Sequence, residues 1–213
     1  MFVVTIDQRS SSRQPDRVPA LLAELERADG IDTVLAAERT VGDEVQLVVS
    51  NGASAVEVVE ISTRLGGWTV GIGVGDIEEP LPASTREARG PAFLSAREAV
   101  ERAKRSPGRV GVTGGADPYA AERSESALWL LVAVQGRRTA RGWQVVDAVR
   151  RAGSQRAAAE ELGVSVQSVS QVLRAAGYME AERGGALATW LLEQLAGPPV
   201  DSAAGPLATG PQR

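Results

Sequence analysis

The stretch that decides the fold of the C-terminal part is GSQRAAAEELGVSVQSVSQVLRAAGY, residues 153–178. Ser154 is a suitable N-cap, and the residues at 155–162 all favour helix. Gly163 then ends this helix, because glycine adopts the positive φ of a sharp turn without steric cost. Ser165 caps a second helix. Two short helices joined by such a turn are typical of a helix-turn-helix.

The second helix is expected to have two different faces. Apolar residues recur at helical spacing and predict a buried face, formed by Val166, Val169, Val172 and Leu173. The opposite face carries Gln167, Gln171 and Arg174 at positions i, i+4 and i+7. Gln binds adenine through two hydrogen bonds and Arg binds guanine or phosphate, so this face suits the major groove of double-stranded DNA. An ordinary helical hairpin with a solvated polar face is the alternative.

The residues predicted to contact DNA form two groups. The second helix of such motifs reads bases with its N-terminal half, which selects Ser165, Gln167, Ser168 and Gln171, followed by Arg174. The start of the first helix would contact the phosphate backbone through Ser154, Gln155 and Arg156.

Basic residues are concentrated in this region. Between residues 136 and 183 the chain has eight Arg and five Asp or Glu, although the whole chain has a net charge of −4. A modestly basic module neutralises few phosphates, so a monomer would bind DNA weakly and in a salt-sensitive manner. We therefore expect a homodimer on two half-sites.

The composition excludes several kinds of chemistry. The 213 residues include no Cys and no His, which excludes disulfides, Cys/His zinc sites, thiol nucleophiles and triads with an imidazole base. The longest apolar run, residues 127–134, is far shorter than the roughly 20 residues of a membrane span. The N-terminus has no basic region before its apolar run, unlike a signal peptide. We expect a soluble, cytoplasmic protein without membrane partners.

The N-terminal part alternates between strand and helix patterns. Strands are predicted at 2–6, 32–39, 45–49, 68–75 and 109–113, and helices at 16–28, 53–65 and 91–105. The order βαββαβαβ predicts an α+β domain in which helices cover one face of a mainly antiparallel sheet. An all-α helix-turn-helix domain would follow it.

These patterns divide the chain into four predicted parts. Residues 1–115 form the α+β domain and 116–141 a connecting helix, whose apolar face serves either core packing or dimerisation. Residues 142–196 form the helix-turn-helix domain. Residues 197–213 are rich in Pro, Gly and Ala and predict a disordered tail.

Two acidic residues mark the ends of neighbouring strands. Asp7 ends the first strand and Asp43 lies in the turn of RTVGDEVQ, so the two carboxylates would meet at one edge of the sheet and hold a divalent metal ion. The segment after Asp7 could bind phosphates through Arg9, Ser10, Ser11 and Ser12. Alternatively, Gly42 and Asp43 are simply good turn residues.

A resemblance bears on this choice. IDQRSS, RTVGDEVQ, WTVGIGVGDI and RGPAFLSAREAVERA resemble, in this order, the first metal strand, the metal hairpin, the following strand and the last helix of class III nucleotidyl cyclases. The resemblance implies a palm-like fold. It also implies that Asp7 and Asp43 hold Mg²⁺ or Mn²⁺ together with a nucleotide.

The sequence departs from that family where its substrate is recognised. Ala37 stands where the family has a base-selecting Lys, and Glu87 stands where it has a base-contacting Asp. Leu94 and Glu98 stand at the positions of the Asn and Arg that stabilise the transition state, and Arg97 is displaced by one residue. We therefore expect a degenerate site that binds a nucleotide without cyclising it, and not an enzyme.

The whole chain resembles the SatD family of bacterial proteins in TVGDEVQ, RTARGWQVVDAVR and GVSVQSVSQVLRAAGY. This resemblance implies a DNA-binding regulator. Three hypotheses follow: a dimeric regulator whose N-terminal domain senses a nucleotide or cyclic nucleotide, an active cyclase or nucleotide hydrolase, and a regulator whose N-terminal domain is only a dimerisation scaffold.

Overall fold

The computed structural model describes residues 1–197, which form a five-stranded sheet and eight α-helices. The strands are β1 (Phe2–Gln8), β2 (Thr33–Arg39), β3 (Glu44–Val49), β4 (Trp68–Val74) and β5 (Val110–Gly114). The helices are α1 (Val18–Arg27), α2 (Gly52–Leu65), α3 (Pro91–Ala103), α4 (Pro118–Gln135), α5 (Ala140–Ala152), α6 (Gln155–Leu162), α7 (Val166–Ala175) and α8 (Tyr178–Ala196). Two short 3-10 helices are η1 (Ser11–Arg13) and η2 (Thr85–Glu87).

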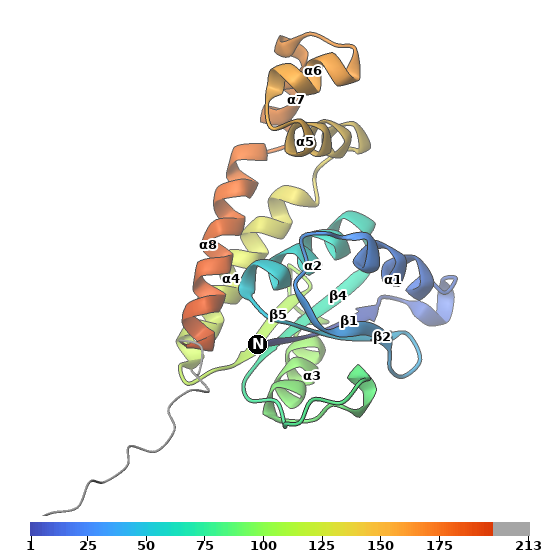
Figure 1. Cartoon of the computed structure of the whole chain (residues 1–213), viewed down its shortest axis with the longest axis vertical. Helices are drawn as coiled ribbons and strands as arrows, with labels where there is room; N and C mark the ends of the chain where they lie inside the picture. Colours follow the sequence, from blue (N-terminus) through green and yellow to red (C-terminus); the bar gives the residue numbers. More distant parts are fainter. Residues whose placement is uncertain (198–213) are drawn as a thin grey trace, which may run out of the picture.

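The sheet has the strand order β2-β3-β1-β4-β5, with β1 at its centre (Figure 1). The pairs β1/β3, β1/β4 and β2/β3 are antiparallel, and β4/β5 is parallel. The predicted order βαββαβαβ and the mainly antiparallel sheet are therefore confirmed. The two neighbours of β1 are β3, which precedes α2 in the chain, and β4, which follows it. The sheet therefore combines pairing between strands that are close in the sequence with pairing between strands that are distant in it.

The helices cover both faces of the sheet, so the prediction of one covered face was wrong. Phe2, Val4 and Ile6 of β1 pack into the core that includes α1 and α2, whereas Val3 packs with Ala92 and Ala96 of α3. On β4, a Cβ added at position 71 or 73 would lie less than 3.0 Å from backbone atoms of α3. The two glycines thus let α3 approach the second face very closely.

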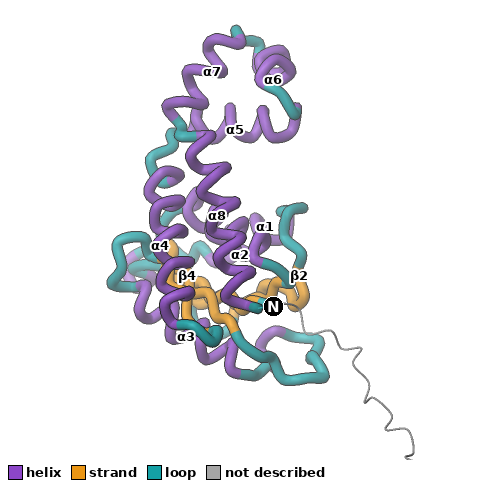
Figure 2. The backbone as a smooth tube through the Cα atoms, turned by 90° about the vertical axis from the view of Figure 1, so that its left-hand side faces the viewer, coloured by secondary structure: helices purple, strands orange, loops and turns teal. Residues whose placement is uncertain are grey.

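The last helix returns to the core of the sheet domain, a contact that the predicted division of the chain did not include. Leu128 and Leu131 of α4 and Leu192 and Leu195 of α8 are buried in the same core as β1 and β4. The two helices run side by side along the molecule (Figure 2). The helix predicted as a connector is therefore part of the N-terminal core, and α8 completes it.

A second, smaller core holds α5, α6 and α7 together at the far end of the α4/α8 pair (Figure 1). It contains Val145, Val146 and Val149 of α5 with Val169 and Leu173 of α7.

Within residues 1–197, no helix has both the length and the apolar character of a membrane span. The predicted tail, apart from its first residue Gly197, lies outside the described residues.

Candidate functional site

The predicted pair of short helices is present with the expected caps and turn. The Ser154 hydroxyl accepts a hydrogen bond from the Ala157 amide at 3.1 Å at the start of α6. The Ser165 hydroxyl accepts one from the Ser168 amide, also at 3.1 Å, at the start of α7. Between them Gly163 has a φ of 64°, which glycine adopts without strain. The local signals were therefore sufficient to place both helices.

Helix α7 is apolar on one face and polar on the other. Val169 and Leu173 are buried against α5 and α6, and Val172 is half-buried. Val166 was predicted to be buried but is 42% exposed, because it lies in the first turn of α7, outside the small core. The opposite face presents Gln167, Gln171 and Arg174 to solvent.

The other residues predicted to contact DNA also lie on the surface of this unit. Ser154, Gln155, Arg156 and Ser165 are exposed, and Ser168 is half-buried. Arg156 is 3.9 Å from Glu160, one helical turn away, so this exposed pair is weak. The guanidinium of Arg156 therefore stays accessible to an anionic partner.

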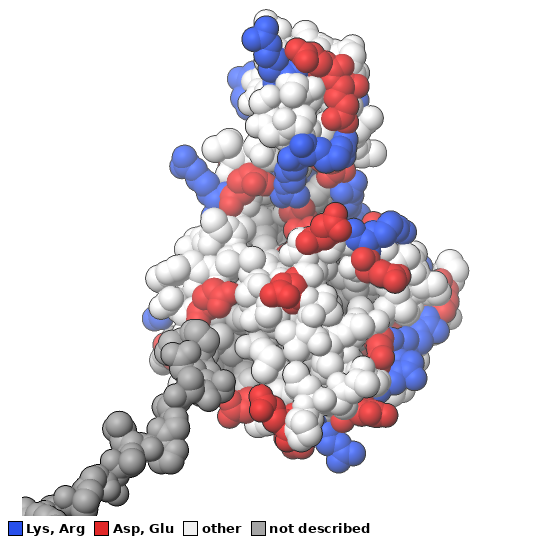
Figure 3. Space-filling model, in the orientation of Figure 1, with Lys and Arg blue, Asp and Glu red and all other residues white. Residues whose placement is uncertain are grey.

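Some of the basic residues counted in the sequence serve the structure. Arg138 is buried and donates to the Ala176 carbonyl at 2.8 Å, and burial lowers its pKa. Arg151 forms an ion pair with Glu161. Basic and acidic side chains lie close together over this end of the molecule (Figure 3). The unit is therefore less basic at its surface than the residue count implies.

A partly buried ion pair joins the α5–α7 unit to the sheet domain. Glu60 of α2 is buried and accepts hydrogen bonds from Arg150 of α5, one of them at 3.2 Å. Arg150 also donates to Glu182 of α8 at 2.8 Å, and Gln135 of α4 donates to Glu60. Burial opposes the charge of Arg150, but the bonds to Glu60 and Glu182 outweigh it and raise the pKa. Side chains of four helices thus meet around Glu60 and Arg150.

Trp143 of α5 lies at the same junction, between two arginines. The guanidinium of Arg138 is 4.6 Å from the ring centroid and that of Arg64 is 5.1 Å from it. Arg64 of α2 also binds Asp147 of α5 through two bonds of 2.7 and 3.1 Å. Sequence reasoning missed these residues, since no local pattern connects segments that lie so far apart in the chain.

The two predicted metal ligands lie close enough to interact, but Asp7 already has a cationic partner. The Nζ of Lys104 is 3.0 Å from the Asp7 carboxylate and 2.6 Å from that of Glu101. Burial raises the pKa of Asp7, Lys104 opposes the rise, and the charges of Asp43 and Glu101 add to it. Among residues 1–197, no three acidic side chains gather in a metal-binding group. A divalent ion at Asp7 would have to displace Lys104.

The predicted phosphate-binding segment lies on the surface after β1. Arg9, Ser10 and Ser11 are exposed, and the Arg9 amide donates to the Gly67 carbonyl at 2.9 Å. Ser12 lies in η1. The segment does not line the groove that the structure forms on the α3 side of the sheet.

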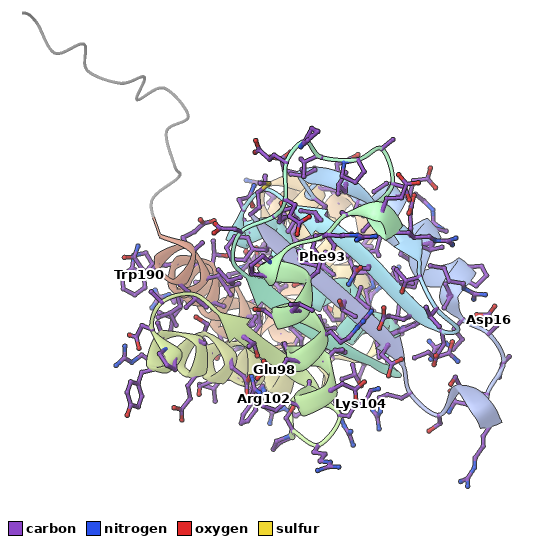
Figure 4. All side chains as sticks on the ribbon, turned by 90° about the horizontal axis from the view of Figure 1, so that it is seen from below. Asp16, Phe93, Glu98, Arg102, Lys104 and Trp190 are labelled. Carbon is purple, nitrogen blue, oxygen red and sulfur yellow. The ribbon has the colours of Figure 1, made fainter. Side chains whose placement is uncertain are left out.

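That groove has a volume of about 560 Å³ and lies between the β2–β3 hairpin, the η2 loop and the N-terminal half of α3. Leu94 and Arg97 line it, whereas Glu98 faces the other side of α3, next to Arg102 and α4 (Figure 4). Ala37 lines a separate apolar pocket beneath α1. The position aligned with a catalytic Arg thus points out of the groove, and its neighbour Arg97 points into it.

Comparisons with protein-family models, with curated proteins and with solved structures found no match to this chain.

Proposed function

We propose that the protein is a transcriptional regulator that binds double-stranded DNA with α7 in the major groove. One observation carries the proposal: α7 is capped, packed on one face through Val169 and Leu173, and exposes Gln167, Gln171 and Arg174 on the other. Two amides and one guanidinium on an accessible helix match the donor and acceptor pattern of base edges. Ser165 and Ser168 add hydroxyls near the helix start. Such a role places the protein in the cytoplasm.

The start of α6 would position the unit on the duplex. Ser154, Gln155 and Arg156 are exposed at the N-terminus of this helix, where amide groups and a guanidinium favour phosphate oxygens. These contacts would set the register, and α7 would read the sequence. An ordinary helical hairpin would carry the same caps, so base reading has to be tested directly.

The protein would bind as a homodimer. Five of the nine exposed large apolar side chains within residues 1–197 lie on the α4/α8 pair: Tyr119, Leu130, Met179, Leu187 and Trp190. Leu130 is 71% and Trp190 57% exposed, and Trp190 points away from the body of the protein (Figure 4). The pair carries α5–α7 at its end, so pairing of two copies here would bring two α7 helices onto one duplex.

The N-terminal domain would act as the sensor. The resemblance to nucleotidyl cyclases and to the SatD family supports a palm-like domain that binds a nucleotide or cyclic nucleotide. Mg²⁺ or Mn²⁺ at Asp7 and Asp43 stays a prediction that requires Lys104 to leave. The ion pair between Glu60 and Arg150 gives the domain a direct connection to α5.

An active cyclase or nucleotide hydrolase is the second candidate, favoured by the position of Arg97 in the groove. Incubation with Mn²⁺ and each nucleoside triphosphate, followed by chromatography, tests it. A new product would establish catalysis, and its loss in Asp43→Ala would assign the site.

The DNA-binding proposal is tested with Gln171→Ala and the DNA upstream of the protein's own gene. We expect affinity for the specific site to fall by about 1–3 kcal/mol, while binding to unrelated DNA stays the same. Gln14→Ala, which removes an exposed Gln far along the chain from α7, is the matched control. If affinity and sequence preference survive in Gln171→Ala, α7 does not read bases.

A further inference from the structure

The groove between α3 and the β2–β3 hairpin is lined by both apolar and basic side chains. Val41 of the hairpin turn is 77% exposed and Leu94 of α3 is 71% exposed, and both line the groove together with Phe93. Exposed apolar side chains that gather around a concavity are typical of ligand sites. The volume of about 560 Å³ suits a small organic molecule.

Three arginines line the same groove. Arg86 and Arg89 belong to the segment around η2, and Arg97 lies one turn after Phe93 on α3. Within residues 1–197, none of these three arginines lies within ion-pairing distance of a carboxylate. Glu78 is the acidic residue of the lining. The lining therefore has an excess of positive charge without internal partners.

The backbone adds to this charge. Helix α3 has 13 residues and begins at this groove with Gly90 as its N-cap, and its first amides donate to the carbonyls of Asp76 and Gly90. The N-terminus of a helix carries a partial positive charge. Gly90 also lets the start of α3 lie close to the segment that follows β4, since a Cβ at position 90 would lie less than 3.0 Å from the backbone of Asp76 and Ile77.

We propose that this groove binds the phosphate monoester of a molecule with a flat apolar body, and that it does so without a metal ion. Arg86, Arg89 and Arg97 bind the phosphate dianion, because guanidinium groups match its oxygens in pairs. Phe93 and Leu94 pack against the apolar body. A regulatory role for this binding rests on the proposed sensor function. The groove is a different site from the one predicted at Asp7 and Ser10.

The three arginines make the metal unnecessary. A phosphate monoester carries close to two negative charges at neutral pH, which a divalent ion neutralises in a carboxylate site. Here the guanidiniums neutralise them directly, while Lys104 neutralises Asp7 at the other end of α3 (Figure 4). Binding should therefore persist in EDTA and weaken with salt, as expected for partly exposed charges.

The test is calorimetry and thermal unfolding of the full chain in EDTA with five probes: phenyl phosphate, AMP, phenol, adenosine and inorganic phosphate. We expect both esters to bind with dissociation constants of about 1 mM or below. Phenol and adenosine should not bind, and inorganic phosphate should bind at least about 10-fold more weakly than the esters. AMP binding without phenyl phosphate binding would overturn the general ester class in favour of a nucleotide-specific site.

Variants locate the site. Arg89→Ala and Arg97→Ala should each weaken ester binding by about 10-fold or more, and Arg97→Lys should weaken it less. Arg105→Ala removes the same charge just beyond α3, outside the lining, and should bind as the unmodified protein does. Phe93→Leu should weaken ester binding and leave inorganic phosphate binding unchanged.

Several results would overturn the inference: no ester binding in EDTA, a requirement for Mg²⁺, loss of binding in Asp7→Asn, or unchanged binding in Arg97→Ala. DNA binding of the same preparations separates this failure from that of the proposed function. A protein that binds DNA but no ester refutes the groove site alone, and one that binds esters but no DNA refutes the regulator alone.

Discussion

Arg150 of α5 and Glu60 of α2 form a partly buried ion pair across 90 residues of sequence, and this pair joins the α5–α7 unit to the sheet domain. Arg150 also donates to Glu182 of α8, and Gln135 of α4 donates to Glu60. A change in the position of α2 therefore reaches α5 through a direct contact. This gives the sensor model a physical route between the two parts.

Removal of Arg150 should destabilise the protein by about 2–3 kcal/mol. This is less than the typical 3–5 kcal/mol for a fully buried pair, because the Arg150 side chain is still 35% exposed. Arg150→Ala leaves the buried Glu60 carboxylate without its cation. Urea unfolding of Arg150→Ala against Arg156→Ala, an exposed arginine of α6, measures the difference. Equal stabilities would show that the pair does not hold the two parts together.

The pKa of Glu57 predicts a pH dependence of stability. Burial raises this pKa above its ordinary value of 4.5, and the neighbouring Glu60 carboxylate adds to the rise. The folded state therefore binds a proton more tightly than the unfolded state, so this contribution to stability is complete below pH 4.5 and is lost as pH rises through the folded pKa.

Glu57→Gln replaces the titrating carboxyl group with a neutral amide, so this position no longer binds a proton more tightly in the folded state than in the unfolded state. We expect the variant to be more stable than the unmodified protein at pH 7 and to lose less stability between pH 4.5 and 7. Denaturant titrations at both pH values check this. Parallel pH profiles for the two proteins would contradict the prediction.

Lys104 should compete with a divalent metal ion for Asp7. Its ammonium contacts the carboxylate at 3.0 Å, and the contacts with Glu101 and Asp7 raise its pKa despite burial, so it stays charged. Lys104→Met should therefore bind Mn²⁺ about 10-fold more tightly than the unmodified protein, because the metal ion no longer has to break the charge-assisted bond between Lys104 and Asp7. Calorimetry measures this, and Asp7→Asn in the same background should abolish the gain. Unchanged or weaker binding in Lys104→Met would contradict the competition.

The α4/α8 face should carry the dimer contact. A Glu at position 190 or 187 would place charge in an interface of apolar side chains, so Trp190→Glu and Leu187→Glu should be monomeric and bind DNA more weakly. Light scattering after size-exclusion chromatography measures the mass. Val41→Glu, a change at an exposed apolar residue away from this pair, should stay dimeric. A dimer in all three variants would place the contact elsewhere.

Local sequence signals determined the two capped helices α6 and α7 and the order of strands and helices along the N-terminal part. Ser154 and Ser165 bind amides only three residues away, and Gly163 takes its positive φ from its own lack of a side chain. The hairpin around Asp43 is equally local. Such features depend on neighbours in the chain, so a linear pattern contains the information that specifies them.

The tertiary structure alone decided which surfaces meet. The sequence does not reveal that Gly71 and Gly73 bring α3 onto the second face, that α8 returns to the first core, or that Arg150 binds Glu60. The sequence also does not reveal that Arg97 lines the groove while Glu98 lies on the other side of α3. These outcomes depend on packing between distant segments, and helical or strand periodicity specifies a buried face without specifying its partner.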